Sequence, residues 1–365
     1  MDMVNVEDCC EILDSMRVPI TASERKEGKY PYYGANGIQD YVDDYIFDDE
    51  LVLLAEDGGN FGSRERPIAY RISGKCWVNN HAHVLKPKKG LDVDYLCYSL
   101  MFYKVEGIVN GATRKKLTQA AMRKMQIPFR RMEEQIHIVN NLNYVLKVKE
   151  KRERKLKLLD ELVRGRFVEL FGDPVSNSYG LPEATLPELG VFGRGVSKHR
   201  PRNDPKLLGG DYPLIQTGDI ANAGLYITSY NSTYSEFGLK QSKMWEKGTL
   251  CITIAANIAK TAILEFDACF PDSVVGFTAN ERTNNIFIHY WFSFFQAILE
   301  SQAPESAQKN INLKILSELK VIVPEKERQN EFANFVHRID KSKFGHLSML
   351  TTIKSAYEQQ TFIYS

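Results

Sequence analysis

Residues 30–38 read Tyr30-Pro31-Tyr32-Tyr33-Gly34-Ala35-Asn36-Gly37-Ile38, and a related stretch, Tyr212-Pro213-Leu214 through Ile220, follows at an offset of 182 residues. A second set of matches has an offset of 194: Lys115, Leu117, Ile127, Glu133 and Gln135 correspond to Lys309, Ile311, Val321, Glu327 and Gln329. This period is far too long for a solenoid repeat. It predicts two homologous globular domains, each followed by a helical segment, with extra loop residues in one copy.

The composition is that of an ordinary globular protein. The 365 residues, 25% charged and 43% hydrophobic, suffice for two domains and connecting helices. The net charge of +1 excludes a polycation, so any nucleic-acid contact must come from local patches. The six cysteines form no CxxC pair, which argues against a zinc cluster or a disulfide framework. We find no signal peptide and no apolar run long enough to span a bilayer, and therefore expect a cytoplasmic protein without membrane contact.

A long amphipathic helix is predicted from Met132 to about Phe171. This stretch contains no proline, and apolar residues recur at spacings of three and four: Ile138, Leu142 and Val145, then Leu156, Leu159, Val163 and Leu170. The sequence Gly172-Asp173-Pro174 ends it. A weaker helical pattern follows Pro324, from Glu325 to the end. A helix of about 39 residues is roughly 58 Å long and needs a partner for its apolar stripe. We expect the two helices to pair antiparallel and to hold the domains apart.

The remaining segments predict an α+β fold with two homologous domains. Short apolar runs between turn residues favour strands at Leu51–Leu54 and Ile68–Tyr70 in the first copy, and at Leu250–Ala255 and Ala262–Phe266 in the second. Apolar helices are expected at Leu96–Val105 and Tyr290–Leu299. We divide the chain into residues 1–131 (first domain), 132–173 (central helical region), 174–325 (second domain) and 326–365 (C-terminal helical region).

Each predicted domain carries a basic segment. Residues 107–132 contain seven Lys or Arg and no acid, and residues 193–206 contain five Lys or Arg and His199 against the single acid Asp204. Residues 38–57 hold eight acids and no base, which indicates a separate acidic surface. Basic segments bind phosphates by releasing counterions, but a solvated surface is an equal alternative. For the basic run Lys147–Lys157 on the helix, a solvated face is the preferred interpretation.

Several segments together resemble the specificity subunit of type I restriction-modification systems. They are Gly111-Ala112-Thr113-Arg114-Lys115-Lys116-Leu117, Met125-Gln126-Ile127-Pro128-Phe129, Glu133-Glu134-Gln135, Phe167-Val168-Glu169-Leu170-Phe171-Gly172-Asp173-Pro174, residues 30–38 and Asn79-Asn80-His81-Ala82-His83. The resemblance covers nearly the whole chain. Departures are Arg130-Arg131, where the family often has prolines, and the second copy, which reads Ala307-Gln308-Lys309-Asn310-Ile311-Asn312-Leu313.

The resemblance implies a non-catalytic subunit with two target-recognition domains. Each would read half of a split DNA sequence, and two helical regions would form an antiparallel coiled coil that spaces them. The implied partners are double-stranded DNA, methyltransferase subunits and motor-nuclease subunits. S-adenosylmethionine, ATP and Mg²⁺ would belong to those partners, and this chain would hold no cofactor. The two domains differ between their shared edges, so they should read different half-sites.

The candidate DNA-binding residues come from the basic segments, from the loop that begins at Gly58, from the repeated element and from the variable part of the second domain. In the first domain they are Arg64, Arg66, Arg114, Lys115 and Lys116. In the second they are Lys198, Arg200, Arg202, Gln216, Thr217, Lys240, Lys243, Lys309 and Asn310, with Gln241 beside them. Arg commonly pairs with guanine, and Asn or Gln with adenine. The loop Gly58–Gly62 is interpreted as a hairpin turn or a DNA-contacting loop, since no Walker lysine follows it. No metal site is expected at His81 and His83, because no third ligand is evident.

Two other functions remain open from the residues alone. The chain could be a self-contained DNA-acting enzyme, in which His81 or Asp57 serves chemically. Against this, no methyltransferase motif, Walker loop or nuclease constellation is found, and we expect no catalytic residue. It could instead be a coiled-coil scaffold between two protein partners, which would predict no salt-sensitive DNA binding.

Overall fold

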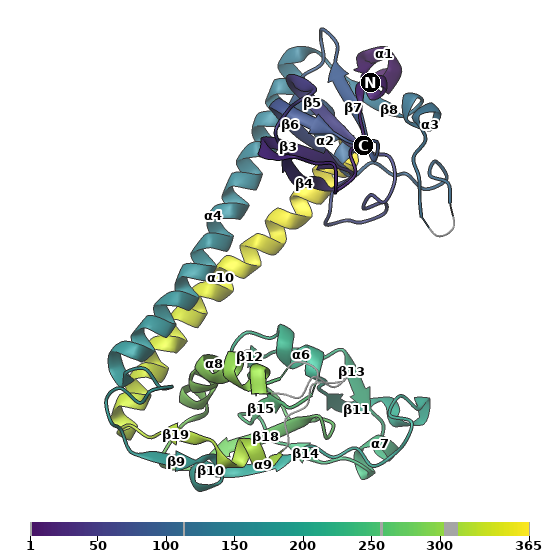
Figure 1. The fold of residues 1–365 in the computed structure, drawn as a ribbon. Helices are drawn as coiled ribbons and strands as arrows, with labels where there is room; N and C mark the ends of the chain where they lie inside the picture. Colours follow the sequence, from purple (N-terminus) through teal and green to yellow (C-terminus); the bar gives the residue numbers. More distant parts are fainter. Residues whose placement is uncertain (1, 112–113, 256–257, 303–312, 365) are drawn as a thin grey trace. The chain divides into compact units, whose positions relative to one another are not determined.

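The computed structural model describes residues 2–111, 114–255, 258–302 and 313–364 (Figure 1). The chain forms two compact units. The first comprises residues 1–153 with 347–365, and the second comprises residues 154–346. Two long helices, α4 (Met132–Phe171) and α10 (Lys326–Tyr364), each run from one unit into the other. The mixture of strands and long helices confirms the predicted α+β class.

A six-stranded sheet forms the centre of the first unit. Its strand order is β2 (Cys10–Ile12), β7 (Ala82–Pro87), β5 (Phe47–Ala55), β6 (Ala69–Val78), β3 (Glu27–Gly34) and β4 (Gly37–Val42). Alternate residues of a strand face opposite sides of a sheet. In β5, accordingly, Leu51 and Leu53 belong to one apolar cluster, while Val52 and Leu54 belong to another. The predicted strands at residues 51–54 and 68–70 are thereby confirmed, although β6 begins at Ala69.

Helix α2 (Val93–Met101) packs against this sheet. Its N-cap is Asp92, whose carboxylate accepts a hydrogen bond from the Tyr95 backbone N–H at 2.9 Å. The predicted helix at residues 96–105 therefore begins and ends too late. The remaining elements of this unit are β1 (Asp2–Asn5) paired antiparallel with β8 (Gln126–Phe129), the short helices α1 (Val6–Cys9) and α3 (Gln119–Arg123), and the 3₁₀ turn η1 (Asp14–Met16).

The described residues of the second unit form three sheets. The first has the order β10 (Gly190–Arg194), β18 (Val274–Ala279), β15 (Leu250–Thr253), β16 (Thr261–Leu264), β12 (Tyr226–Ile227). The second has the order β13 (Ser232–Tyr234), β11 (Leu208–Leu214), β17 (Ala268–Cys269), β14 (Met244–Trp245). The third pairs β19 (Lys320–Ile322) with β9 (Glu183–Thr185). The helical elements are α5 (Leu186–Leu189), η2 (Pro205–Leu207), α6 (Thr217–Asn222), α7 (Glu236–Lys240), α8 (Asn285–Gln302) and α9 (Leu313–Glu318).

An aromatic cluster joins the long helices to the core of the second unit. Phe167 and Phe171 of α4 contact Phe287 of α8 and Phe332 of α10, with ring centroids 5.0–5.7 Å apart. All four side chains are fully buried. The predicted helix at residues 290–299 lies within α8. This packing fixes the end of α4 and the start of α10 in the same core.

The apolar stripe predicted for α4 is confirmed. Leu142, Val163 and Leu170 are buried, and Ile138, Val145, Leu156 and Leu159 are half-buried. Within the second unit, Asp160 contacts Lys343 of α10 and Arg166 contacts Glu331 at 2.6 Å. The partner number falls as the α4 number rises, so the two helices run antiparallel. Among the described residues, no helix is long and apolar enough to cross a membrane.

The repeat has a structural counterpart at the start of each long helix. Gln135 and Gln329 are both fully buried. The Nε2 of Gln135 donates to the carbonyls of Arg130 at 2.8 Å and Gly90 at 2.9 Å. The Nε2 of Gln329 donates to the carbonyls of Pro324 at 2.8 Å and Arg282 at 3.0 Å. In both copies, the glutamine follows an antiparallel strand pair, β1–β8 or β9–β19, and ties a helix to its own unit.

Candidate nucleic-acid interface

Part of the basic segment of the first unit, residues 110–117, forms a short loop. Asn110 and Lys116 are hydrogen-bonded to each other through both backbone groups, at 2.7 and 2.9 Å, and they close the loop. The backbone N–H of Leu117 donates to the carbonyl of Glu56 at 2.7 Å. Arg114, Lys115 and Lys116 are all exposed. We call residues 110–117 the basic loop; its residues 112 and 113 lie outside the described part of the chain.

Two carboxylates lie beneath the basic loop. Asp57 contacts the Arg114 guanidinium at 3.1 Å, and Glu56 contacts the Lys116 ammonium at 3.0 Å. The acidic side chains are mostly buried, with 19% and 12% of their surface exposed, while the two bases are 61% and 50% exposed. Lys115 makes no ion pair with a residue that the structure describes. The acidic run 38–57 is therefore not wholly a separate surface, because its last two residues hold the basic loop.

A buried polar network supports these carboxylates from below. Arg17 contacts Glu56 at 2.6 Å and donates to the carbonyl of Ala82 at 2.7 Å. His83 is fully buried, with Nδ1 2.6 Å from Asp14 and Nε2 2.9 Å from the carbonyl oxygen of Leu117. The carbonyl can only accept a hydrogen bond, so Nε2 carries a proton. The network thus connects the base of the basic loop to strand β7.

The charges of the network are compensated within the protein. Burial alone would raise the pKa of Asp14, but hydrogen bonds from His83, from the Val84 N–H and from Gln119 hold the pKa below its ordinary value. Burial likewise opposes ionisation of Glu56, and Arg17 and Lys116 lower its pKa. Asp14, Glu56 and His83 offer ligand atoms within 4.8 Å of one another. Arg17 already supplies the positive charge among them, so this arrangement has the chemistry of an ion-pair network.

His81 and His83 engage different carboxylates. His81, just before β7, lies with Nδ1 2.5 Å from Asp57, whereas His83 contacts Asp14. The two imidazoles therefore serve as separate hydrogen-bonding partners. Asp14, Arg17 and Glu56 were not among the predicted functional residues. Glu56 belongs to the acidic run 38–57, whereas Asp14 and Arg17 lie outside both charge runs and carried no sequence signal.

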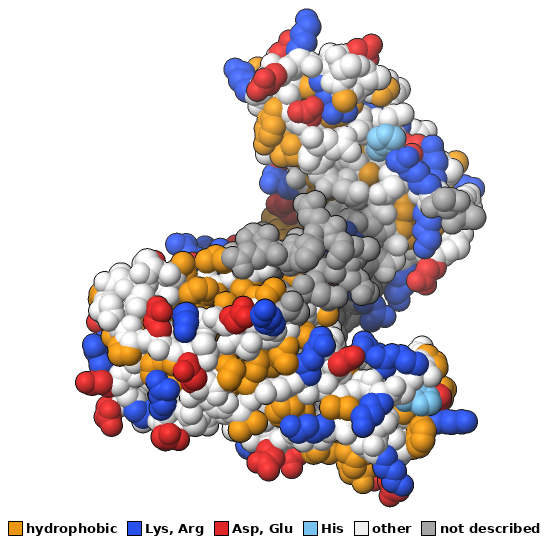
Figure 2. All heavy atoms as spheres, turned by 60° about the horizontal axis from the view of Figure 1, so that its bottom comes forward, with side chains coloured by type: hydrophobic (Ala, Val, Ile, Leu, Met, Phe, Trp, Pro, Cys, Tyr) orange, Lys and Arg blue, Asp and Glu red, His pale blue; other side chains and the backbone are white. Residues whose placement is uncertain are grey.

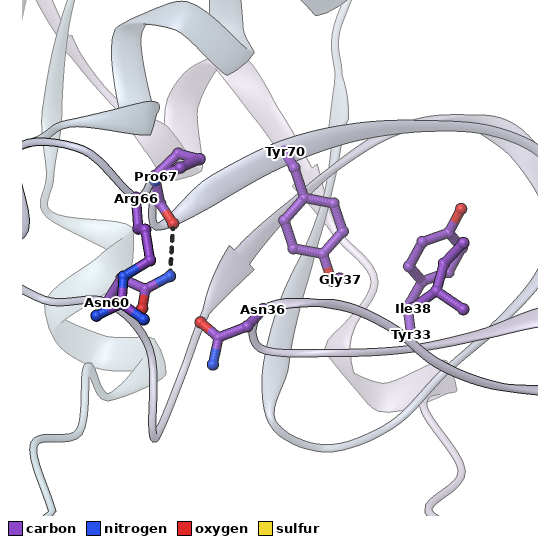
Figure 3. Close-up of a pocket in the computed structure, with 8 residues that line it drawn as sticks. All are labelled: Tyr33, Asn36, Gly37, Ile38, Asn60, Arg66, Pro67 and Tyr70. Atoms are coloured by element: carbon purple, nitrogen blue, oxygen red, sulfur yellow. Dashed lines mark hydrogen bonds between the residues drawn. The ribbon is translucent and has the colours of Figure 1, made fainter. Parts of the chain in front are cut away.

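The loop after β5 carries the other candidates of the first unit. Arg64 and Arg66 are both exposed on it. Arg66 lines a cavity of about 590 Å³, together with Asn36 and Asn60 (Figure 3). The Nδ2 of Asn36 donates to the carbonyl of Gly58 at 3.0 Å. At Gly58, with φ of 64°, an added Cβ would lie 3.1 Å from the Arg114 guanidinium. The hairpin tip, this loop and the basic loop thus meet at Gly58.

The candidates of the second unit lie on several elements. Arg200 and Arg202 share the carboxylate of Asp272, the former at 3.5 Å. The Oε1 of Gln241 accepts hydrogen bonds from the backbone N–H groups of Lys198 at 2.7 Å and His199 at 3.0 Å. This brings Lys198 next to the end of α7, where Lys240 lies.

The remaining candidates have distinct local environments. Lys243 lies over the Trp245 ring, 3.7 Å from its centroid. Gln216 is the N-cap of α6, which begins at Thr217, and its backbone N–H donates to Asp219 at 2.8 Å. Lys309 and Asn310 lie outside the described residues. Figure 2 shows Lys and Arg side chains dispersed among Asp and Glu side chains on the visible face.

The sequence matches a known family in both halves. The pattern of the type I restriction modification DNA specificity domain matches residues 1–159 and again residues 188–347. The chain belongs to this family. It is a non-catalytic specificity subunit of the type I restriction-modification class, with two recognition domains joined by a helical spacer. The two matches coincide with the internal repeat.

Relatives and solved structures agree with this assignment. A putative type I restriction enzyme specificity subunit of Haemophilus influenzae, S.HindORF215P, is 27% identical over 92% of this chain and 86% of its own length. A putative type I restriction enzyme MjaX specificity subunit of Methanocaldococcus jannaschii is 21% identical over 70% of this chain and 64% of its own length. The S subunit structure from M. genitalium has a TM-score of 0.60 at 15% identity and covers 99% of this chain and 95% of its own. A solved structure described as the structural basis of complex assembly and conformational transition of the type I R-M system has a TM-score of 0.58 at 14% identity. The match covers 99% of this chain and 96% of that chain.

Proposed function

We propose that residues 1–131 and 174–325 each read one half of a split DNA target, and that the helical regions 132–173 and 326–365 set the distance between the halves. The observation that carries this proposal is the basic loop. It projects three exposed cations, Arg114, Lys115 and Lys116, from a rigid base in a specificity subunit whose recognition unit occurs twice. Such cations position a protein on the phosphate backbone, whereas base edges supply the specificity.

The ion pairs of the basic loop define how it would bind. DNA phosphates would displace the carboxylates of Asp57 and Glu56 from Arg114 and Lys116. When phosphate takes these bases, the mostly buried carboxylates keep other partners, because Glu56 also contacts Arg17 at 2.6 Å and Asp57 lies 2.5 Å from Nδ1 of His81. Lys115 is available without exchange. In the second unit, we assign the same role to Lys198, Arg200, Arg202, Lys240, Lys243, Lys309 and Asn310, with Gln216 and Thr217 as candidates near α6.

The assembly partners follow from the class of protein. We propose double-stranded DNA, methyltransferase subunits and motor-nuclease subunits as the partners of this chain in the cytoplasm. S-adenosylmethionine, ATP and Mg²⁺ would be held by those subunits. The large apolar side chains that α4 leaves exposed, including Ile136, Tyr144, Leu158 and Leu162, support a protein contact along that helix.

The basic loop gives a direct test. The double substitution Arg114→Ala and Lys115→Ala, in the complex with methyltransferase subunits, should weaken binding to every DNA sequence alike. The slope of log affinity against log salt concentration is negative, and its magnitude should fall by about 2, because each lost phosphate contact removes roughly 0.9 released counterions. Fluorescence anisotropy with specific and random duplexes over a salt series measures both effects.

The control is Arg123→Ala with Lys124→Ala, which removes the same charge from another part of the basic segment, where Arg123 is half-buried and Lys124 is exposed. This control should leave the salt slope closer to that of the unaltered chain. A double variant in the basic loop that binds DNA with unchanged affinity and slope would contradict the proposal.

A further inference from the structure

The cavity of the first unit lies between a hairpin tip and the loop that follows β5. Its volume is about 590 Å³, within the range of ligand-binding sites. Strands β3 and β4 form the hairpin, which turns at Ala35-Asn36, and Gly37, the first residue of β4, has a φ of 110°. Figure 3 shows Asn60 and Arg66 at the left, Asn36 next to them, and Tyr70 beyond Asn36 on the side of Ile38.

The walls of this cavity are held by a few defined contacts. Asn36 donates to the carbonyl of Gly58, and the Nδ2 of Asn60 donates to the carbonyl of Pro67 at 3.4 Å. The hydroxyl of Tyr70 donates to the carbonyl of Gly34 in the hairpin. No described residue donates to the Oδ1 atom of Asn36 or Asn60. Each amide therefore keeps a free acceptor and one free donor hydrogen.

One apolar and one charged side chain of the cavity, Ile38 and Arg66, are exposed. Ile38 is 49% exposed at the end of the hairpin. The Arg66 guanidinium is exposed and makes no ion pair with a residue that the structure describes. The Ile38 side chain cannot form hydrogen bonds with water and is available for an apolar contact. The Arg66 guanidinium and the amides of Asn36 and Asn60 offer several directed hydrogen-bond donors. These groups suit a polar ligand that also carries apolar parts.

The edges of DNA bases match this set of groups. Asn forms two hydrogen bonds with adenine, Arg forms two with guanine, and an apolar side chain contacts the methyl group of thymine. A two-stranded β ribbon also fits the major groove. The cavity lies beside the basic loop, because the Gly58 carbonyl accepts from Asn36 and a Cβ added at Gly58 would lie 3.1 Å from the Arg114 guanidinium. A phosphate held at the basic loop would bring base edges within reach of the hairpin tip.

We propose that Asn36, Ile38, Asn60 and Arg66 read base edges of the half-site that the first unit recognises. This inference rests on the proposed function, since it assumes that the first unit binds DNA. It adds the residues that confer specificity to the residues that bind phosphate. Asn36, Asn60 and Arg66 come from a hairpin tip and a loop, and Ile38 is an exposed residue at the start of β4, so their side chains can be exchanged without altering the core of the sheet.

The test compares methylation specificities. A plasmid library with random inserts is methylated by the complex that contains the unaltered chain, Arg66→Lys or Ile38→Ser, and the methylated sequences are determined. Arg66→Lys keeps the positive charge but loses the paired donors of the guanidinium. We expect each substitution to relax one position of one half-site, with discrimination falling roughly 5- to 150-fold. The other half-site should stay unchanged.

Tyr41→Ser serves as the matched control. Tyr41 lies on the same strand as Ile38, is also 49% exposed, and does not line the cavity. It should leave both half-sites unchanged. The inference is overturned if both cavity variants, folded and active, retain the full first half-site, or if they lower methylation of all sequences equally. If the unaltered chain itself directs no split motif, the proposed function has failed instead.

Discussion

Asp14 is buried beneath the basic loop, and several hydrogen-bond donors stabilise its charge. They include His83 at 2.6 Å, the Val84 N–H at 2.9 Å and Gln119 at 2.9 Å. A carboxyl with a lowered pKa in the folded state contributes stability that is fully present above its ordinary pKa of 3.8. That stability is lost as the pH falls through the folded-state pKa. We therefore expect Asp14→Asn to destabilise the protein at neutral pH.

The pH dependence of this variant distinguishes the charge from the packing. Urea unfolding between neutral pH and about pH 2 should show a smaller loss of stability on acidification for Asp14→Asn than for the unaltered chain. Asp43→Asn, which removes an exposed acid of the same unit, should leave the curve nearly unchanged. Parallel curves for the unaltered chain and Asp14→Asn would show that Asp14 is not held as a carboxylate.

Sequence reasoning found Arg114 and Lys116 but neither Arg17 nor the acids Asp14 and Glu56. Arg114 and Asp57 are 57 positions apart, and His83 and Asp14 are 69 apart. Such pairs depend on which strands of the sheet are neighbours, and neither composition nor periodicity specifies that order. The sequence shows an acidic run and a basic run, but it does not tell which acids of the run are buried and pair with the bases.

The start of each long helix depends on one buried glutamine. In Gln135→Ala, the carbonyls of Gly90 and Arg130 and the N–H of Asp92 would lose their partner. Each buried polar group left without a partner costs about 1–3 kcal/mol. We expect Gln135→Ala to destabilise the first unit and Gln329→Ala the second, each by roughly 2–5 kcal/mol, as measured by urea unfolding of the full chain.

Asn140→Ala is the control for this prediction, since Asn140 is exposed on the same helix. It should change the free energy of unfolding by less than about 0.5 kcal/mol. Equal, small effects of Gln135→Ala and Asn140→Ala would mean that the glutamine does not anchor the helix.

The helical pair gives a prediction about the spacing of the target. Deleting residues 147–153 of α4 leaves Val145 and Leu156 four positions apart, so the apolar stripe keeps its phase. A matching heptad must be removed from α10, because the helices are paired antiparallel through Asp160 and Lys343. Seven residues shorten a helix by about 10 Å. The gap between half-sites should decrease by about three base pairs, at about 3.4 Å each.

Methylation mapping of this double deletion measures the gap directly. Both half-sites should be retained while the number of unspecified bases between them falls. An unchanged gap, with both half-sites intact, would rule out a role of the helices in setting the spacing. Deletion from α4 alone serves as the control, and it should impair the pairing and lower activity.

At the scale of the whole molecule, sequence reasoning was most successful where a pattern repeats. The offset matches predicted two units, and the family pattern matches each half. The stripe on α4 predicted its bounds, since periodicity over forty residues is a strong signal. The boundaries of α2 were wrong, because the cap at Asp92 outweighed the apolar run. The cavity could not be foreseen, since its residues come from two segments that meet only in the folded sheet.

The most direct test of the account is a map of adenine methylation. Cells that contain the chain and the methyltransferase subunits proposed as its partners are compared with cells that lack only this chain. The account predicts one split motif, with two unlike half-sites at a fixed distance, that disappears when the chain is absent. A continuous motif, or methylation that does not depend on the chain, would contradict the claim that two recognition units each read half of the target.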